Sequence, residues 1–123
     1  MARKLAETTL HRLAKALDDQ RERLLATLED LEAETRAVRL SETSSERSPD
    51  PATAEGGALV YELEKGFSIA ENTRDLIAQV EHAKERLRTG VYGRCESCGT
   101  SIPVARLEAL PYTTVCVKCA SRS

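Results

Sequence analysis

The sequence predicts a mainly helical fold, an antiparallel helical hairpin (a coiled coil) joined to a small module organised by four cysteines. Three observations predict this fold. Residues 3–40 contain no glycine or proline, a second segment of similar length repeats the helical pattern, and all four cysteines lie within the last 30 residues. The chain is 31% charged and only 3% aromatic, a composition typical of long solvated helices rather than of a large globular core.

The first segment is expected to form one uninterrupted helix over residues 3–40. Apolar residues recur every seven positions along it, which is the pattern of a helix packed lengthwise on another helix: Leu10, Leu17, Leu24, Leu31 and Val38, with Leu13 and Leu28 beside them. The partner positions Gln20, Thr27 and Glu34 are polar, so the apolar stripe is narrow. We therefore expect an antiparallel partner from the same chain, and a monomer.

A change of composition separates the two helices. Residues 41–57 are rich in Ser, Thr, Pro, Gly and acidic residues, which predicts a turn or loop at the tip of the hairpin. A second helix is expected from about residue 58 to 89, with Leu63, Ala70, Ile77, Val80 and Leu87 on its inner face. Phe67 is expected in the same seam. Basic residues and then Gly90 mark the end of this helix.

The helix lengths predict the size and the boundaries of the arm. Two helices of about 35 residues, at about 1.5 Å rise per residue, form a hairpin about 50 Å long. We expect residues 1–90 to form this arm and residues 91–123 the cysteine module. Asp50 and Pro51 lie in the tip loop. They fit an N-cap and a first helical residue, and they also fit an exposed carboxylate offered to a partner.

The cysteines form two Cys-x2-Cys pairs separated by 17 residues: Cys95, Cys98, Cys116 and Cys119. Two such pairs at this separation are typical of a tetrahedral zinc site with four thiolate ligands. A redox pair is the alternative, but it normally stands alone at a helix N-terminus within a βαβ unit, which this pattern lacks. Four thiolates leave no position for water, so we expect one structural Zn²⁺ rather than a catalytic one.

Local signals outline the module around the cysteines. Residues 103–110 predict a short helix, with Pro103 in its first turn and Pro111 beyond its end. Val115 and Val117 flank Cys116 and are expected in a short strand. Tyr92 and Tyr112 are expected to pack in the small core that the metal organises.

Charge and hydropathy restrict the classes of function. The net charge is −2 and no segment carries a basic stripe, so charge does not favour direct DNA binding. No stretch is apolar enough for a signal peptide or a membrane span, so we expect a cytoplasmic protein without membrane contact. No nucleophile–base pair or open metal site can be assembled, so we do not expect an enzyme.

The module resembles the DksA/TraR family. Residues 92–99 read YGRCESCG, and the likeness continues through Ile102-Pro103, Arg106-Leu107-Glu108-Ala109, Pro111 and the CVKC pair at residues 116–119. It covers about 30 residues closely and about 80 with the preceding hairpin, whereas residues 1–40 resemble the family only as a helix.

This resemblance implies a bacterial transcription regulator that binds RNA polymerase rather than DNA. In that family the module and the hairpin lodge at the rim of the polymerase's secondary channel, and an acidic tip points toward the active site. Promoter output changes, often together with guanosine tetraphosphate. On this reading Asp50 is the candidate for the tip contact and the zinc site sets the direction of the arm.

Two departures accompany the resemblance. The family's tip reads Asp-Pro-x-Asp-x-Ala, but residues 50–55 read DPATAE, so Thr53 replaces the second Asp and Glu55 the Ala. Only four residues follow Cys119, so the family's C-terminal helix is expected to be absent or vestigial. The altered tip leaves open an adaptor that binds another protein, and the mildly basic last segment leaves open a DNA-binding zinc ribbon.

Overall fold

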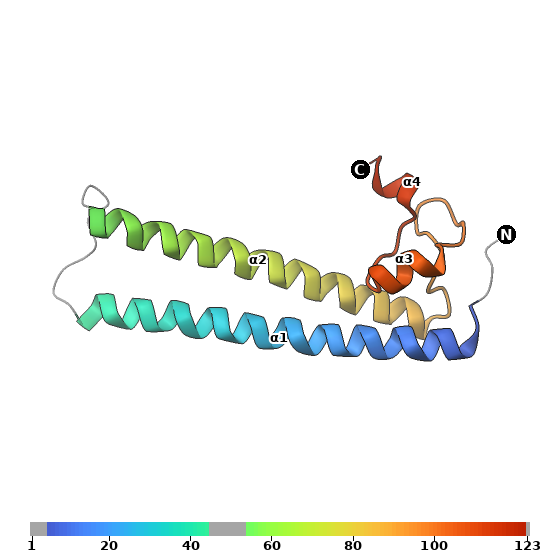
Figure 1. Ribbon diagram of the computed structural model, residues 1–123, viewed down its shortest axis with the longest axis horizontal. Helices are drawn as coiled ribbons and strands as arrows, with labels where there is room; N and C mark the ends of the chain where they lie inside the picture. The colour runs from blue at the N-terminus through green and yellow to red at the C-terminus, as the bar shows by residue number, and fades with distance from the viewer. Residues whose placement is uncertain (1–4, 45–53, 123) are drawn as a thin grey trace. The chain divides into compact units, whose positions relative to one another are not determined.

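The computed structural model describes residues 5–44 and 54–122 and consists of four helices. They are α1 (Glu7–Ser44), α2 (Ala54–Arg88), α3 (Val104–Ala109) and α4 (Val117–Ala120). The two long helices pack as a hairpin, which confirms the predicted fold class (Figure 1). Within the described residues there is no strand, only an isolated antiparallel bridge between Arg94 and Ser101.

The long helices differ from the predicted ones at their ends. The first begins at Glu7, where the N–H of Leu10 bonds to the carbonyl of Ala6, and it continues through residues 41–44. The second begins at Ala54 rather than at residue 58. Ser, Thr and Gly each cost a helix no more than about 1 kcal/mol relative to Ala, and helix growth from an existing end tolerates this. The predicted loop is therefore shorter than residues 41–57.

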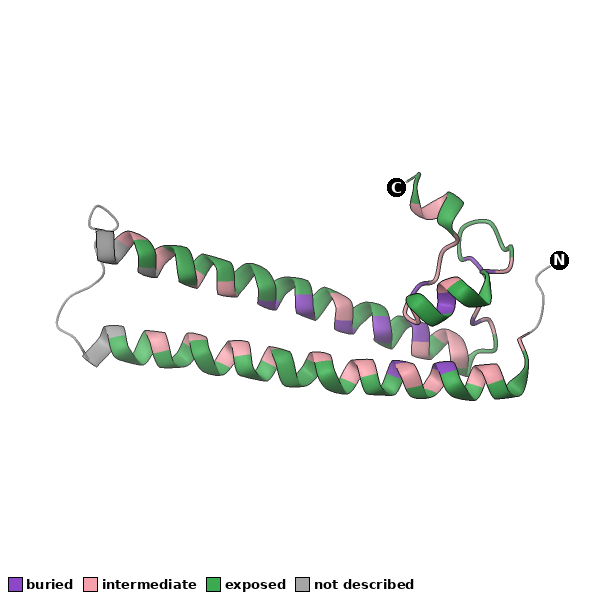
Figure 2. Cartoon of the chain, viewed as in Figure 1, coloured by how far each residue is buried: buried purple, intermediate pink, exposed green. Residues whose placement is uncertain are grey.

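The predicted heptad positions recur along the two long helices, and Figure 2 shows buried and half-buried residues at intervals along the described parts of both. Every one of the predicted positions is buried or half-buried. The partner positions on α1 change along the helix: Gln20 is half-buried, whereas Thr27 and Glu34 are exposed, with Leu28 and Thr35 half-buried instead. This drift follows from the 3.6-residue turn of an α-helix, which does not match a repeat of seven.

Contacts divide the chain into two units that differ from the predicted division at residue 90. One unit comprises residues 1–23 and 77–123 and has the larger core: Leu13, Leu17, Ile77, Val80, Ala83, Tyr92, Cys95, Ile102, Leu107 and Thr113. Exposed ion pairs join its two long helices, Arg21 with Glu81 at 3.2 Å and Lys84 with Asp18 at 2.7 Å. The proposed arm and module boundaries stay a prediction.

The other unit, residues 24–76, has a thin core of small residues on α2. Ala70 and Thr73 are buried, and an ideal Cβ on Gly66 would lie 4.0 Å from the Thr35 hydroxyl oxygen. Small side chains let two helices approach closely but bury little apolar area. Stability in this unit therefore depends on close packing of few atoms, and the Arg74–Glu32 pair at 3.1 Å is exposed.

Phe67 does not lie in the seam, so this expectation is wrong. Its side chain is 44% exposed, and the guanidinium of Arg39 lies 5.3 Å from the centre of its ring. Gly66 and Ala70 occupy the inner positions at this level, which turns Phe67 to the side of the helix. A cation over an exposed ring contributes about 0.5–1 kcal/mol.

The end of α2 follows the predicted signal. The N–H of Val91 bonds to the carbonyl of Arg86, and the N–H of Gly90 to that of Leu87. These two bonds form a Schellman motif, which places Gly90 at the position that needs a left-handed backbone. Its φ is +81°. Across the described ranges, no helix has the length and apolar character needed to cross a bilayer.

Candidate metal centre

The four cysteines converge on one point at the end of the module. Their sulfur atoms all lie within 4.8 Å of one another, although the two pairs are far apart in sequence. The first pair lies on the turn after α2, where the N–H of Cys95 bonds to the carbonyl of Thr100 and the N–H of Gly99 to that of Cys95. Cys116 precedes α4, and Cys119 belongs to its only turn.

The arrangement fits a tetrahedral zinc ion. Zinc–sulfur bonds of about 2.3 Å place tetrahedral ligands about 3.8 Å apart. The Sγ atoms of Cys98 and Cys116 lie 3.7 Å apart. Cys95 is buried, Cys98 is exposed, and the second pair is intermediate. The cluster is therefore covered on the side of Cys95 and open to solvent on the side of Cys98.

The thiol pKa values show why a cation suits this cluster. Burial disfavours the Cys95 thiolate, but the N–H groups of Cys116, Cys98 and Ser97 donate to its sulfur and lower its pKa to about 6. The N–H of Cys119 likewise lowers the pKa of Cys116. The pKa of Cys119 rises to about 12 because its thiol bonds to Cys116 and Cys95. Four sulfurs this close can all be thiolates only around a positive ion.

Neighbouring groups hold the second half of the module in place. Burial raises the pKa of Tyr92 to about 12, and its hydroxyl donates to the carbonyl of Pro111 at 2.8 Å. Arg106 on α3 donates to the carbonyl of Val115 at 3.2 Å, just before the second cysteine pair. The predicted packing role of Tyr92 is therefore confirmed. The expected strand around Val117 is wrong, since Val117 begins α4 and is 60% exposed.

Leu5, which precedes α1, also packs on the module. Gly93 has a φ of +88°, and a Cβ there would lie 2.8 Å from Cδ1 of Leu5 and 3.7 Å from Cδ1 of Leu107. Arg12 on α1 pairs with Glu108 on α3. Both long helices therefore contact the cysteine module directly.

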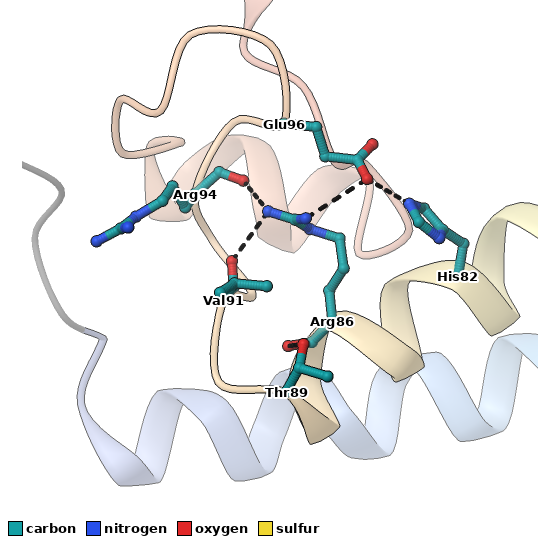
Figure 3. Close-up of polar contacts among 6 residues, drawn as sticks. All are labelled: His82, Arg86, Thr89, Val91, Arg94 and Glu96. Carbon is teal, nitrogen blue, oxygen red and sulfur yellow. Dashed lines mark hydrogen bonds and ion pairs between the residues drawn. The ribbon is translucent and has the colours of Figure 1, made fainter.

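A polar network joins the first cysteine pair to α2, and the sequence did not reveal it. Glu96, between Cys95 and Cys98, pairs with His82 and with Arg86, which lie one turn apart on α2 (Figure 3). The pKa of Glu96 is lowered: burial opposes its charge, but the Thr114 hydroxyl, His82 and Arg86 outweigh this. The His82 side chain is 52% exposed and nevertheless contacts Glu96.

A shallow hollow lies beside this network. Its volume is about 240 Å³, and its charged or titratable lining groups are His82, Arg106 and Tyr112. Asp50 and Pro51, the predicted tip contacts, lie outside the described residues.

The hairpin and the four-cysteine cluster define a class, that of helical proteins with a C4-type zinc finger. Residues 90–123 match the family model described as the prokaryotic dksA/traR C4-type zinc finger. The chain belongs to the DksA/TraR family. This confirms the resemblance drawn from the cysteine pairs and the residues around them.

Individual relatives extend the match beyond the module. General stress protein 16O of Bacillus subtilis is 34% identical over 112 residues, covering 91% of this chain and 66% of that protein. RNA polymerase-binding transcription factor DksA of Escherichia coli is 32% identical over 71 residues, covering 58% of this chain and 46% of that protein. The chain thus spans about two thirds of the first relative and under half of the second.

A solved structure is similar along nearly the whole chain. Transcription factor DksA2 from Pseudomonas aeruginosa has a TM-score of 0.76 at 27% identity, covering 94% of this chain and 83% of that chain. The likeness therefore includes the hairpin as well as the zinc finger.

Proposed function

We propose that this protein binds bacterial RNA polymerase and regulates transcription, with the hairpin tip inserted into the secondary channel. The proposal is supported by the structural match of both the hairpin and the module to transcription factor DksA2. It is also supported by the similarity to DksA of Escherichia coli, which is described as an RNA polymerase-binding transcription factor. Neither half alone would suffice, because helical hairpins and C4 zinc fingers each occur in unrelated proteins. We propose a cytoplasmic, monomeric factor.

One structural Zn²⁺ is the proposed cofactor, with Cys95, Cys98, Cys116 and Cys119 as its ligands. The ion would supply a crosslink between two short segments that have little apolar core of their own. The four thiolates would fill its shell. The protein's own groups do the rest: N–H donors stabilise the sulfurs, and Glu96 and Arg106 join the two cysteine pairs to the helices.

Charge supports an electrostatic action of the arm. Residues 24–76 carry twelve acidic and five basic side chains, net −7, whereas the other unit carries net +5. Inside a polymerase channel, the acidic residues 24–76 of the arm would change the local potential around a catalytic cation without making any bond themselves. Asp50 is the proposed contact at the tip, and Thr53 and Glu55 predict an effect that differs from that of the Asp-Pro-x-Asp-x-Ala tip.

Purified polymerase and protein test the proposal directly. We expect the two to co-purify and the protein to change transcript yield from a promoter with an unstable open complex. Asp50→Ala is expected to abolish the change in transcript yield while binding persists. Repeating the assay with and without guanosine tetraphosphate tests the expected effector. A folded, zinc-loaded protein that neither binds polymerase nor alters transcription would overturn the proposal.

The altered tip favours one second candidate, an adaptor whose arm and module bind another protein. An adaptor should ignore polymerase, and Asp50→Ala should leave its phenotype unchanged. The hypothesis of a DNA-binding zinc ribbon loses the support of a basic module once the charge of the metal site is included. Residues 91–123 carry net +2, and four thiolates around Zn²⁺ add −2, which leaves the module neutral.

A further inference from the structure

The guanidinium of Arg86 lies over the short connection between α2 and the first cysteine pair. Its Nη2 donates to the carbonyls of Val91 at 3.2 Å and Arg94 at 2.8 Å, and its Nη1 lies 3.4 Å from Glu96 Oε1 (Figure 3). The side chain is only 16% exposed. Three acceptors in different directions suit the fixed fork of an arginine, and a lysine ammonium could not reach them together.

Both the backbone and the side chain of Glu96 make contacts. Its backbone N–H bonds to the carbonyl of Thr114 at 2.8 Å, and its neighbours in sequence include two proposed metal ligands. Its carboxylate meets Arg86 and His82 on the same face of α2. The position of the Glu96 carboxylate against α2 therefore depends on the backbone of the first cysteine pair.

The alternative links at this end of α2 are weaker. The Schellman bonds around Gly90 fix the last turn locally but contact no cysteine. Arg88 is 71% exposed and pairs with Glu85, three residues earlier in the same helix. Arg88 therefore provides a matched control for Arg86, with the same chemistry two positions away and no contact to the module among those described.

We propose that Arg86 and Glu96 are positioning residues that couple metal binding at the four cysteines to the order of the last turns of α2. With the metal bound, the first cysteine pair fixes Glu96, which holds Arg86 over residues 91–94. Without the metal, the pair loosens and Arg86 loses its acceptors. The inference rests on the proposed zinc site but not on polymerase binding.

Hydrogen exchange with and without Zn²⁺ tests the coupling. In the natural protein and in Arg88→Gln, we expect Zn²⁺ to slow exchange over residues 82–94 by at least about tenfold, equivalent to about 1.4 kcal/mol. In Arg86→Lys and in Glu96→Gln, we expect this slowing to fall below about threefold. Residues 57–70 of α2 provide an internal reference in every sample.

Zn²⁺ affinity provides a second measurement. If Arg86 had a purely structural role, its substitution would not change Zn²⁺ affinity and hydrogen exchange by the same factor. A coupling between two sites acts equally in both directions. Chelator competition should therefore show that Arg86→Lys weakens Zn²⁺ binding by the same factor by which it reduces the zinc-dependent slowing of exchange. Arg88→Gln should change neither quantity.

Three outcomes would overturn the coupling. One is undiminished zinc-dependent slowing in both Arg86→Lys and Glu96→Gln. Another is weakened Zn²⁺ binding without a matching change in exchange. A third is an equal effect of Arg88→Gln. If Arg86→Lys does not fold, Glu96→Gln decides alone, because an amide keeps the shape of the side chain and removes only its charge.

Discussion

Replacing Gly93 with alanine tests whether Leu5, which precedes α1, packs on the cysteine module. Gly93 has a φ of +88°, which an alanine adopts only with strain. The new Cβ would also lie 2.8 Å from Cδ1 and 3.4 Å from Cγ of Leu5. The substitution therefore combines a backbone cost with a steric overlap.

The two costs can be separated. A left-handed backbone costs alanine about 1–2 kcal/mol. Leu5 can relieve the overlap by turning away, but it then gives up its partial burial, which costs about 1 kcal/mol more. We expect Gly93→Ala to lower the free energy of unfolding by about 2–3 kcal/mol.

Gly90 supplies the control. Its φ is +81° and nothing lies within 4 Å of an ideal Cβ, so Gly90→Ala should show the backbone cost alone. In a Leu5→Ala background, Gly93→Ala should fall to the same value as Gly90→Ala. Urea unfolding of zinc-loaded protein, followed by helical circular dichroism, measures all four variants. Equal losses for Gly90→Ala and Gly93→Ala in the natural background would refute the packing of Leu5 on the module.

Three further predictions concern the module and the seam. Tyr92→Phe should lower the free energy of unfolding by about 1 kcal/mol at neutral pH, because the hydrogen bond to Pro111 is lost. Burial raises the pKa of Tyr92 to about 12, so the stability that the neutral phenol contributes is complete below pH about 10 and is lost as pH rises through about 12. Unfolding measured at neutral and at alkaline pH should therefore show the stabilities of the two proteins converging. Ala70→Leu should lower the free energy of unfolding by about 1–3 kcal/mol because it overfills the seam between the helices. Ala78→Leu on the exposed face should change it by less than about 0.5 kcal/mol. Equal effects of the two substitutions in thermal unfolding would contradict the packing of Ala70 in the seam. Chelator competition should show that Zn²⁺ affinity rises with pH, because binding displaces thiol protons. Cys95→Ser should weaken Zn²⁺ affinity severely. An affinity that does not depend on pH would contradict a thiolate site.

The sequence predicted the hairpin because its signals are local and repeated. Heptad spacing identified the inner faces of both helices, and Gly90 after a basic turn identified the end of α2. Four cysteines in two pairs identified the metal cluster, since their spacing alone restricts the geometry. Each helix face and each Cys-x2-Cys pair depends on residues that are a few positions apart, and only the joining of the two cysteine pairs involves distant residues.

What the sequence did not predict depends on contacts between distant segments. Glu96 and Arg86 carry no motif, and their contact exists only because the module folds back on α2. The contact of Leu5 with Gly93 likewise joins two segments that are far apart in sequence. Phe67 is exposed despite its hydrophobicity because its place in the repeat lies beside the inner positions of Gly66 and Ala70.

Site-specific crosslinking from residue 50 tests the central claim most directly. A photoreactive group there, on zinc-loaded protein mixed with bacterial RNA polymerase, should attach to the large subunits near the catalytic centre, and a group at an exposed module position such as Lys118 should attach only near the channel rim. Crosslinks from residue 50 to the outer surface of polymerase, or to no subunit at all, would contradict the account.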